Sequence, residues 1–209
     1  MTEPKAVAPK LETVVPGVLH WRLSDERIGG ATSSAHAVRD RLGATVLVDP
    51  LPLGEEALAE LEPVRAIVLT AATHQRSSWR YRKRFGAPVY LPAGSRATEE
   101  APDEHYGAGD TLPGGLEAVH APGPEDPHYA LLLREGPGVL FCPDLVMMDR
   151  QGPLVFVPAR FHDDPAETRR SVERLLGLPF AVLCLDHGPP VLEDPKGALR
   201  RLLSETESG

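Results

Sequence analysis

The sequence predicts an α+β protein in which two β-sheets pack face to face and helices cover both outer faces, an αββα sandwich. The chain has 209 residues, of which 42% are hydrophobic and 25% are charged, enough for one globular domain with a sizeable core. Its predicted elements fall into two similar halves, each with strands, a helix, a strand and a helix. No unit repeats at a fixed period. Two such α+β halves suit two packed sheets with helices outside.

The first half starts after a polar, proline-interrupted stretch over residues 1–10, which we expect to be a flexible N-terminal arm. Residues 11–209 are expected to form a single domain. Turn residues and short apolar runs predict strands within residues 11–23, around Pro16-Gly17, and over 35–38, 45–48, 64–69 and 88–91. Helices are predicted over 54–61 and 77–85, the second of which ends at Gly86.

The second half contains strands over residues 116–120, 129–133 and 139–142, a helix from Asp164, a buried strand over 180–185 and a last helix over 196–204. The start of the first helix is the best defined. Asp164 can cap it, Pro165 suits the first helical position, and Glu167 completes a capping box.

Charge and cysteine content exclude several classes of protein. The formal net charge of −8 argues against a nucleic-acid partner, because an acidic surface repels phosphates. Cys142 and Cys184 lie in apolar runs and predict no disulfide, so we expect a cytoplasmic protein. The chain opens without a secretory signal pattern, and no apolar run reaches the roughly 20 residues that cross a bilayer, so no membrane partner is expected.

A cluster of cations over residues 76–84 surrounds Trp79 and Tyr81. We interpret it as a solvated helix face with aromatic anchors beneath it. The two aromatic side chains also suit a pocket or a dimer contact, so a homodimer stays open.

The stretch from Thr70 to Arg76 is the most informative part of the chain. An apolar strand runs straight into it, and three further segments follow: Gly114 to Pro124, Leu140 to Asp144, and Asp186-His187-Gly188. This order resembles the metallo-β-lactamase superfamily, whose first metal loop reads Thr-His-x-His-x-Asp-His. The resemblance covers residues 11–203 and implies the αββα sandwich.

The resemblance also places the metal-ligand positions of that family on this chain. Five of them carry residues that are not ordinary zinc ligands: Ala71, Thr73, Gln75, Arg76 and Pro124. Asp144 and His187 match the metal-bridging carboxylate and the last histidine. Anchoring the motif on Thr73 instead puts His74 at the first histidine position but does not restore the loop. The metal site is therefore expected to be degenerate.

Two functional interpretations follow. In the favoured one, the protein is a metal-free pseudoenzyme in which Arg76 replaces the metal as the partner of Asp144. It has no cofactor, and it is non-catalytic or binds a small anionic molecule through Arg76, His74 and His187.

In the alternative, His74, Asp144 and His187 are catalytic residues that hold one zinc or iron ion in a hydrolase of ester, thioester or lactone substrates. Whether the protein is an enzyme stays open, since fold membership selects no reaction.

Other polar residues have simpler interpretations. Asp49 ends a strand, where carboxylates commonly cap turns. Within His162-Asp163-Asp164, which has the composition of a metal-binding triplet, Asp164 is better explained as the helix cap. The histidines at positions 20, 36 and 105 are expected to be structural or solvated.

Overall fold

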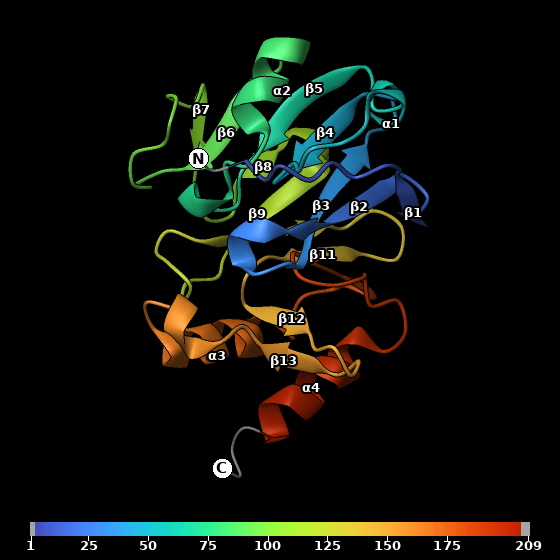
Figure 1. Ribbon diagram of the computed structural model, residues 1–209. Helices are drawn as coiled ribbons and strands as arrows, with labels where there is room; N and C mark the ends of the chain where they lie inside the picture. The colour runs from blue at the N-terminus through green and yellow to red at the C-terminus, as the bar shows by residue number, and fades with distance from the viewer. Residues whose placement is uncertain (1–2, 206–209) are drawn as a thin grey trace. The chain divides into compact units, whose positions relative to one another are not determined.

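The computed structural model describes residues 3–205 (Figure 1). The chain divides into two compact units. The first comprises the residues up to Gly107 together with Thr111–Gly115, and the second comprises Ala108–Asp110 and the residues from Leu116 onward.

The first unit is built on a seven-stranded sheet in the order β1-β2-β3-β4-β5-β6-β7. Its strands are β1 (Glu12–Val15), β2 (Val18–Asp25), β3 (Ala31–Arg39), β4 (Thr45–Val48), β5 (Val64–Val68), β6 (Val89–Pro92) and β7 (Glu104–Tyr106). Strands β1 to β4 pair antiparallel, whereas β4 to β7 pair parallel. The unit also holds the helices α1 (Glu55–Ala59) and α2 (Ser78–Phe85) and the 3₁₀ helices η1 (Glu26–Ile28) and η2 (Ala72–His74).

Helix α2 is anchored by its aromatic residues. Trp79 and Tyr81 are buried in the core cluster of this unit, and the Tyr81 hydroxyl donates to the Leu51 carbonyl at 3.1 Å. Arg82 and Lys83 lie on the outer side and form ion pairs with acidic residues. The interpretation of residues 76–84 as aromatic anchors beneath a solvated, charged helix face is therefore confirmed for α2. It is wrong for Arg76, which precedes the helix and is buried.

The other large sheet has five strands in the order β14-β11-β10-β9-β8, and β12 and β13 form a two-stranded sheet. These strands are β8 (Thr111–Leu112), β9 (Leu116–His120), β10 (Tyr129–Leu133), β11 (Val139–Cys142), β12 (Val146–Met148), β13 (Leu154–Phe156) and β14 (Val182–Leu185). The remaining elements are η3 (Pro113–Gly115), η4 (Ala159–Phe161), α3 (Pro165–Leu175) and α4 (Pro195–Glu205).

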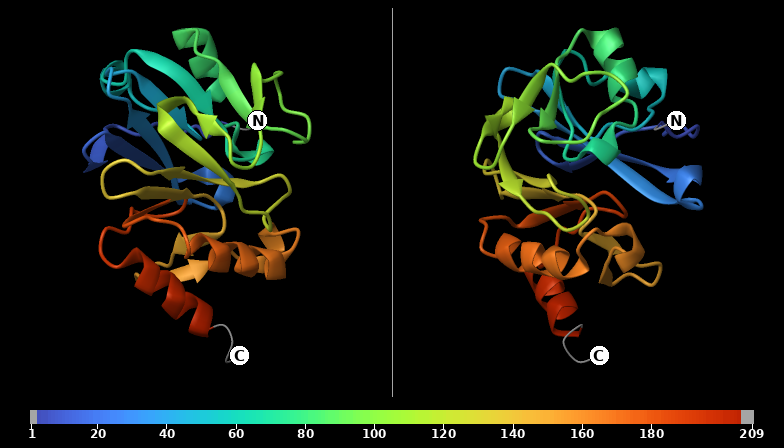
Figure 2. Two further views of the ribbon diagram at one scale, coloured as in Figure 1. Left: turned by 180° about the vertical axis from the view of Figure 1, so that it is seen from behind. Right: turned by 90° about the vertical axis from the view of Figure 1, so that its left-hand side faces the viewer.

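The two long helices, α3 and α4, cover the core of the second unit (Figure 2). Val172 of α3 and Leu199 of α4 are fully buried with Leu140 and Leu183 of the sheet. Because β11 and β14 are parallel, with Cys142 opposite Leu185, the segments that follow these two strands leave the same edge of the sheet.

Every predicted helix and strand is present, although β3 begins at Ala31 rather than at residue 35. The sequence missed β7, β8, β12 and β13, each of three residues or fewer, because such short strands show no clear alternation. Cys142 and Cys184 are buried free thiols, as expected. Within residues 3–205, no helix has the length and apolar character that crossing a membrane requires.

The N-terminal segment, expected to be a flexible arm, makes defined contacts in its described part. Ala8 is buried and forms a parallel bridge with Leu53. Its amide donates to the Pro52 carbonyl at 3.0 Å. Met1 and Thr2 lie outside the described residues.

Two histidines lie side by side in the first sheet. His20 of β2 is directly opposite His36 of β3, their ring centroids are 5.2 Å apart, and both residues are buried. Burial lowers the pKa of His20 from 6.5 to about 4. Both histidines therefore have the structural role that the sequence predicts.

Replacing Asp164 tests the predicted cap of α3. Its side chain accepts a hydrogen bond from the Glu167 amide at 2.9 Å. Asp164→Ala is expected to lower the free energy of unfolding by about 1 kcal/mol, because one amide of the first turn loses its acceptor. Urea denaturation measures this change. The neighbouring exposed residue gives a matched control, Asp163→Ala, which should have little effect; equal losses in both variants would contradict the cap.

A second prediction concerns acid stability. The unfolded state takes up a proton on His20 near pH 6.5, whereas the folded state does so only near pH 4. Neutral His20 therefore contributes fully to the free energy of unfolding above pH 6.5, and this contribution decreases as the pH falls toward 4. Between pH 7.5 and pH 5, the free energy of unfolding of the wild type should therefore fall by about 2 kcal/mol more than that of His20→Leu. Urea denaturation at the two pH values measures both changes. Parallel pH curves for the two proteins would show that His20 is not buried in its neutral form.

Candidate functional site

Polar residues gather where β4 and β5 of the first unit end. The two strands are parallel, with Val48 opposite Val68, so Asp49 and Thr70 follow their carboxyl ends close together. The Thr70 amide donates to Asp49 Oδ1 at 2.9 Å, and the Thr70 hydroxyl donates to Asp49 Oδ2 at 2.5 Å. Both residues are fully buried, which makes this carboxylate the organising group of the loop that follows β5.

His74, in the short helix η2, completes the contacts of this carboxylate. Its Nδ1 lies 3.1 Å from Asp49 Oδ2 and 2.9 Å from Thr70 Oγ1. Since a carboxylate only accepts hydrogen bonds, Nδ1 carries a proton in this arrangement. Burial alone would raise the pKa of Asp49, but His74 and the charge of Arg76 hold that pKa below its ordinary value.

Arg76 is a buried cation in the same loop, with only 5% of its surface exposed. Its Nη1 donates to the Ser34 carbonyl of β3 at 2.8 Å and to the Asp49 carbonyl at 3.0 Å. The guanidinium thus contacts the backbone at two neighbouring strands of the sheet. The Ser77 amide donates to the Pro50 carbonyl at 3.0 Å, which closes the loop at its far end.

The interpretation of Asp49 as an ordinary turn cap is wrong. A carboxylate that caps a local turn bonds amides a few residues away, whereas Asp49 bonds residues 21 and 25 positions further along the chain. In the sequence, the only local feature that marks Asp49 is the Asp-Pro dipeptide at the end of a buried strand. The pairing of β4 with β5, which makes Asp49 important, is not visible in that dipeptide.

A second polar pair lies in the second unit, at the carboxyl ends of β11 and β14. His187 Nε2 lies 3.0 Å from Asp144 Oδ1, and both side chains are partly accessible, at 16% and 24%. The structure therefore brings together two of the predicted site residues. The neighbouring Asp186 is buried, and its charge, with that of Asp144, adds to burial in raising the pKa of the Cys142 thiol.

His162 contacts the backbone of this pair and a residue of α3. Its Nε2 lies 3.1 Å from the Asp144 carbonyl and its Nδ1 lies 2.9 Å from the Thr168 hydroxyl. Burial lowers the pKa of His162 below its ordinary value. Asp164 caps α3, as predicted. The described contacts of His162 and Asp164 are thus with the backbone and side chains of nearby segments.

Backbone strain coincides with these networks. Asp49, Arg76 and Asp144 have φ angles of 45°, 42° and 49°, and only one other non-glycine residue in the described chain, Asp194, has a positive φ. Residues other than glycine adopt this backbone conformation at a cost in free energy, which the surrounding contacts must offset. Strain of this kind concentrates at functional sites, which supports both networks as candidates.

The remaining loop positions have other contacts. Ala71 is buried, and the side-chain amide of Gln75 donates to the Ala72 carbonyl at 3.0 Å. Gln75 Oε1 accepts from Trp79 Nε1 at 2.9 Å. His74 and Arg76 each contact Asp49, whereas the pairing of Arg76 with Asp144 stays a prediction.

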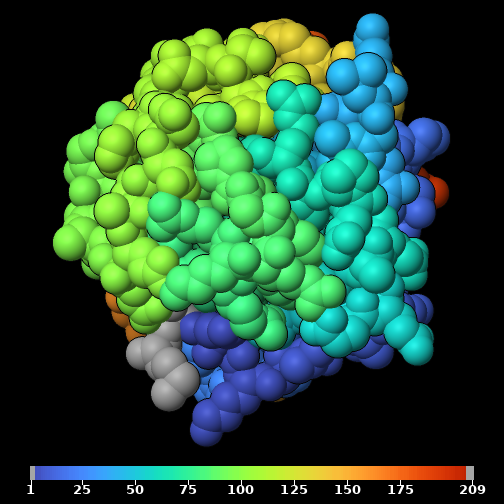
Figure 3. All heavy atoms as spheres, turned by 90° about the horizontal axis from the view of Figure 1, so that it is seen from above, coloured from blue at the N-terminus to red at the C-terminus, as the bar shows by residue number. Residues whose placement is uncertain are grey.

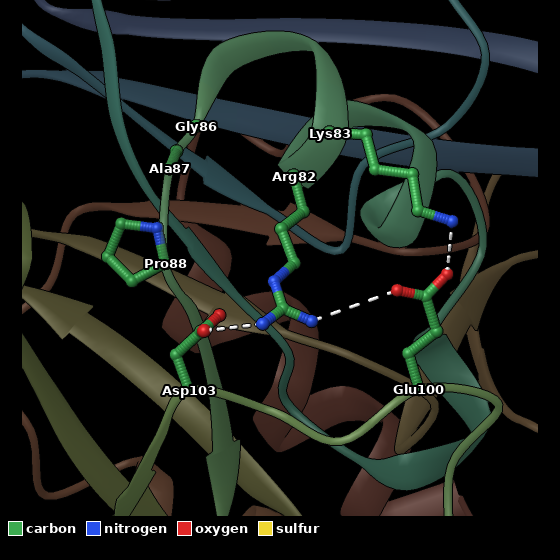
Figure 4. A pocket seen from close by; sticks show the side chains of 7 residues that line it. All are labelled: Arg82, Lys83, Gly86, Ala87, Pro88, Glu100 and Asp103. Carbon is green, nitrogen blue, oxygen red and sulfur yellow. Dashed lines mark hydrogen bonds and ion pairs between the residues drawn. The ribbon is translucent and has the colours of Figure 1, made fainter.

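A surface pocket of about 370 Å³ lies at the end of α2 and is lined by Arg82, Lys83, Gly86, Ala87, Pro88, Glu100 and Asp103 (Figure 4). Its charged residues already pair with one another. Arg82 lies 2.6 Å from Asp103, and Lys83 lies 2.6 Å from Glu100. A charged ligand would have to displace these partners, so the pocket is a weaker candidate than the two networks.

Comparison with known proteins bears on both the fold and the family. A family model described as "Metallo-beta-lactamase superfamily" matches residues 21–205. No curated protein sequence matches the chain.

Many solved structures are similar. A metallo-β-lactamase from Pontibacter korlensis is 20% identical over 93% of this chain and 98% of its own, with a TM-score of 0.71. FIM-1 from Pseudomonas aeruginosa, in a mono-zinc form, is 16% identical over 100% of both chains, with a TM-score of 0.71. A metallo-β-lactamase from Erythrobacter litoralis is 17% identical over 95% of this chain and 92% of its own, with a TM-score of 0.69.

These structural similarities confirm the predicted α+β sandwich fold. The family match covers most of the sequence, including both candidate networks. The chain therefore belongs to the metallo-β-lactamase superfamily.

Proposed function

We propose that this protein does not perform the zinc-dependent hydrolysis of its superfamily, and that an ion network of Asp49, His74 and Arg76 holds its former metal loop. One observation carries the proposal: the Arg76 guanidinium is buried in that loop and bonded to the Ser34 and Asp49 carbonyls. A permanent cation satisfies the local negative charge that a metal ion otherwise balances.

The residues of this loop do not fit zinc. Zinc takes imidazole, thiolate or carboxylate ligands, and a catalytic site normally uses three of them. The loop offers Ala71, Thr73, Gln75 and Arg76 at the ligand positions of its superfamily. Its one histidine, His74, supplies a single imidazole, which is fewer than the three ligands that a catalytic zinc normally needs. The positive charge of Arg76 repels a dication.

An anion is the ligand that such a loop favours. A guanidinium binds carboxylate or phosphate groups through several N–H donors, and an imidazole adds a further polar contact. We assign Arg76 and His74 to the binding of a small anionic molecule. His187 remains a predicted ligand-binding residue.

The contact between Asp144 and His187 favours a second candidate, a hydrolase that uses one metal ion. A carboxylate bonded to a partly exposed imidazole suits a general base or a metal ligand. For this candidate, the sequence prediction names His74, Asp144 and His187 as catalytic residues that hold one zinc or iron ion.

Elemental analysis separates the two candidates. Protein purified without a histidine tag and without chelator is expected to contain only traces of zinc and iron. Its melting temperature should not change in EDTA, since metal that stabilises a fold is lost to a chelator. Near-stoichiometric zinc or iron, together with a lower melting temperature in EDTA, would support the one-metal hydrolase instead.

Replacing Arg76 tests the role of the guanidinium. Arg76→Met should lower the free energy of unfolding by about 3–5 kcal/mol, because it leaves the buried Asp49 charge with fewer partners. The control, Arg84→Met, removes an exposed ion pair of α2 and should cost no more than about 1 kcal/mol. Chemical denaturation measures both. A change within ~0.5 kcal/mol for Arg76→Met would mean that this side chain is solvated.

A further inference from the structure

Helix α2 begins where the candidate loop, residues 70–77 after β5, ends. The helix lacks the usual stabilisation at its N-terminus. Ser77 is the N-cap residue, yet its side chain makes no capping hydrogen bond to the helix, and the first turn contains no acidic residue. The N-terminus of a helix carries partial positive charge and favours a nearby anion. In α2 the cation Arg80 adds to that positive charge.

A carboxylate from the start of the chain lies at this position. Glu3 Oε1 accepts a hydrogen bond from the Ser77 hydroxyl at 2.7 Å and lies 2.8 Å from Arg80 Nη2. Glu3 and Ser77 are 74 positions apart, so this contact is tertiary. Figure 3 shows the dark blue N-terminal segment running along this face of the first unit, next to the green segment that contains α2.

The rest of the N-terminal segment holds Glu3 in place. The Lys5 amide donates to Glu26 Oε1 at 2.8 Å. The Ala8 amide donates to the Pro52 carbonyl, and the Ala8 carbonyl accepts from the Gly54 amide at 2.9 Å. These contacts attach the segment to η1 and to the chain just before α1.

We propose that residues 3–8 form a strap that supplies the missing N-terminal charge of α2 through Glu3 and so orders the loop that carries His74 and Arg76. Ser77 connects the two parts physically. Its hydroxyl bonds the strap, its amide bonds the Pro50 carbonyl, and its carbonyl accepts from the Tyr81 amide at 3.0 Å. Release of the strap loosens the end of the loop next to Arg76, so the order of the loop depends on the docking of the N-terminal segment.

Hydrogen–deuterium exchange of the full-length protein tests this proposal. Glu3→Gln removes the charge and keeps the size of the side chain. Amides over residues 72–82 are expected to exchange about tenfold faster, the effect of a lost helix cap, while those of β10 and β14 stay unchanged. The control, Glu12→Gln, alters a partly exposed carboxylate on β1 that lies 3.3 Å from Lys10, and should leave residues 72–82 as in the wild type.

A second pair of variants makes the test independent of general destabilisation. Ser77→Ala should reproduce the faster exchange, and the double variant should be no faster than the faster single variant, because both changes weaken the same Glu3–Ser77 contact, one through its charge and the other through its hydroxyl. Three outcomes would overturn the strap: exchange within about twofold of wild type in Glu3→Gln, acceleration equal in all segments, or additive effects in the double variant.

Discussion

The buried carboxylate of Asp49 is the group on which the candidate loop depends. Removing a carboxylate from water is costly unless hydrogen bonds and positive charge compensate for it. Asp49 obtains them from Thr70, His74 and Arg76, all of which follow the next strand of the sheet. The same contacts fix the path of the loop, because Thr70 and His74 must both reach the carboxylate and Arg76 must reach the Asp49 carbonyl. Loop conformation and the ionised state of Asp49 are therefore coupled.

The topology repeats this arrangement in the second unit, where β11 and β14 are parallel and Asp144 meets His187 beyond their ends. Parallel strands deliver their following loops to one edge of a sheet, where polar side chains can meet without interrupting the core. Positive φ angles at Asp49, Arg76 and Asp144 place backbone strain at these same edges. Each unit thus combines a strained aspartate with a histidine beyond the carboxyl ends of two neighbouring parallel strands.

Superfamily membership establishes the fold and leaves the chemistry to individual side chains. Under our proposal, a guanidinium performs the electrostatic role of a metal ion in the loop of the first unit. It balances a buried carboxylate and ties neighbouring strands together through backbone carbonyls. It does not lower the pKa of a bound water molecule, which is the step that makes zinc enzymes effective hydrolases. A loop held in this way keeps its shape while it favours anions.

The sequence by itself determined the αββα fold, nearly all of the helices and longer strands, and the cap of α3 at Asp164, since apolar periodicity and capping residues are local signals. It also identified Asp144, His187, His74 and Arg76 as candidates through the resemblance of short motifs. Only the tertiary structure decided which side chains meet. Asp49 and His74 are 25 positions apart, and Asp144 and His187 are 43 apart. Their contacts depend on which strands pair and in what register, and neither is specified by the residues around each position.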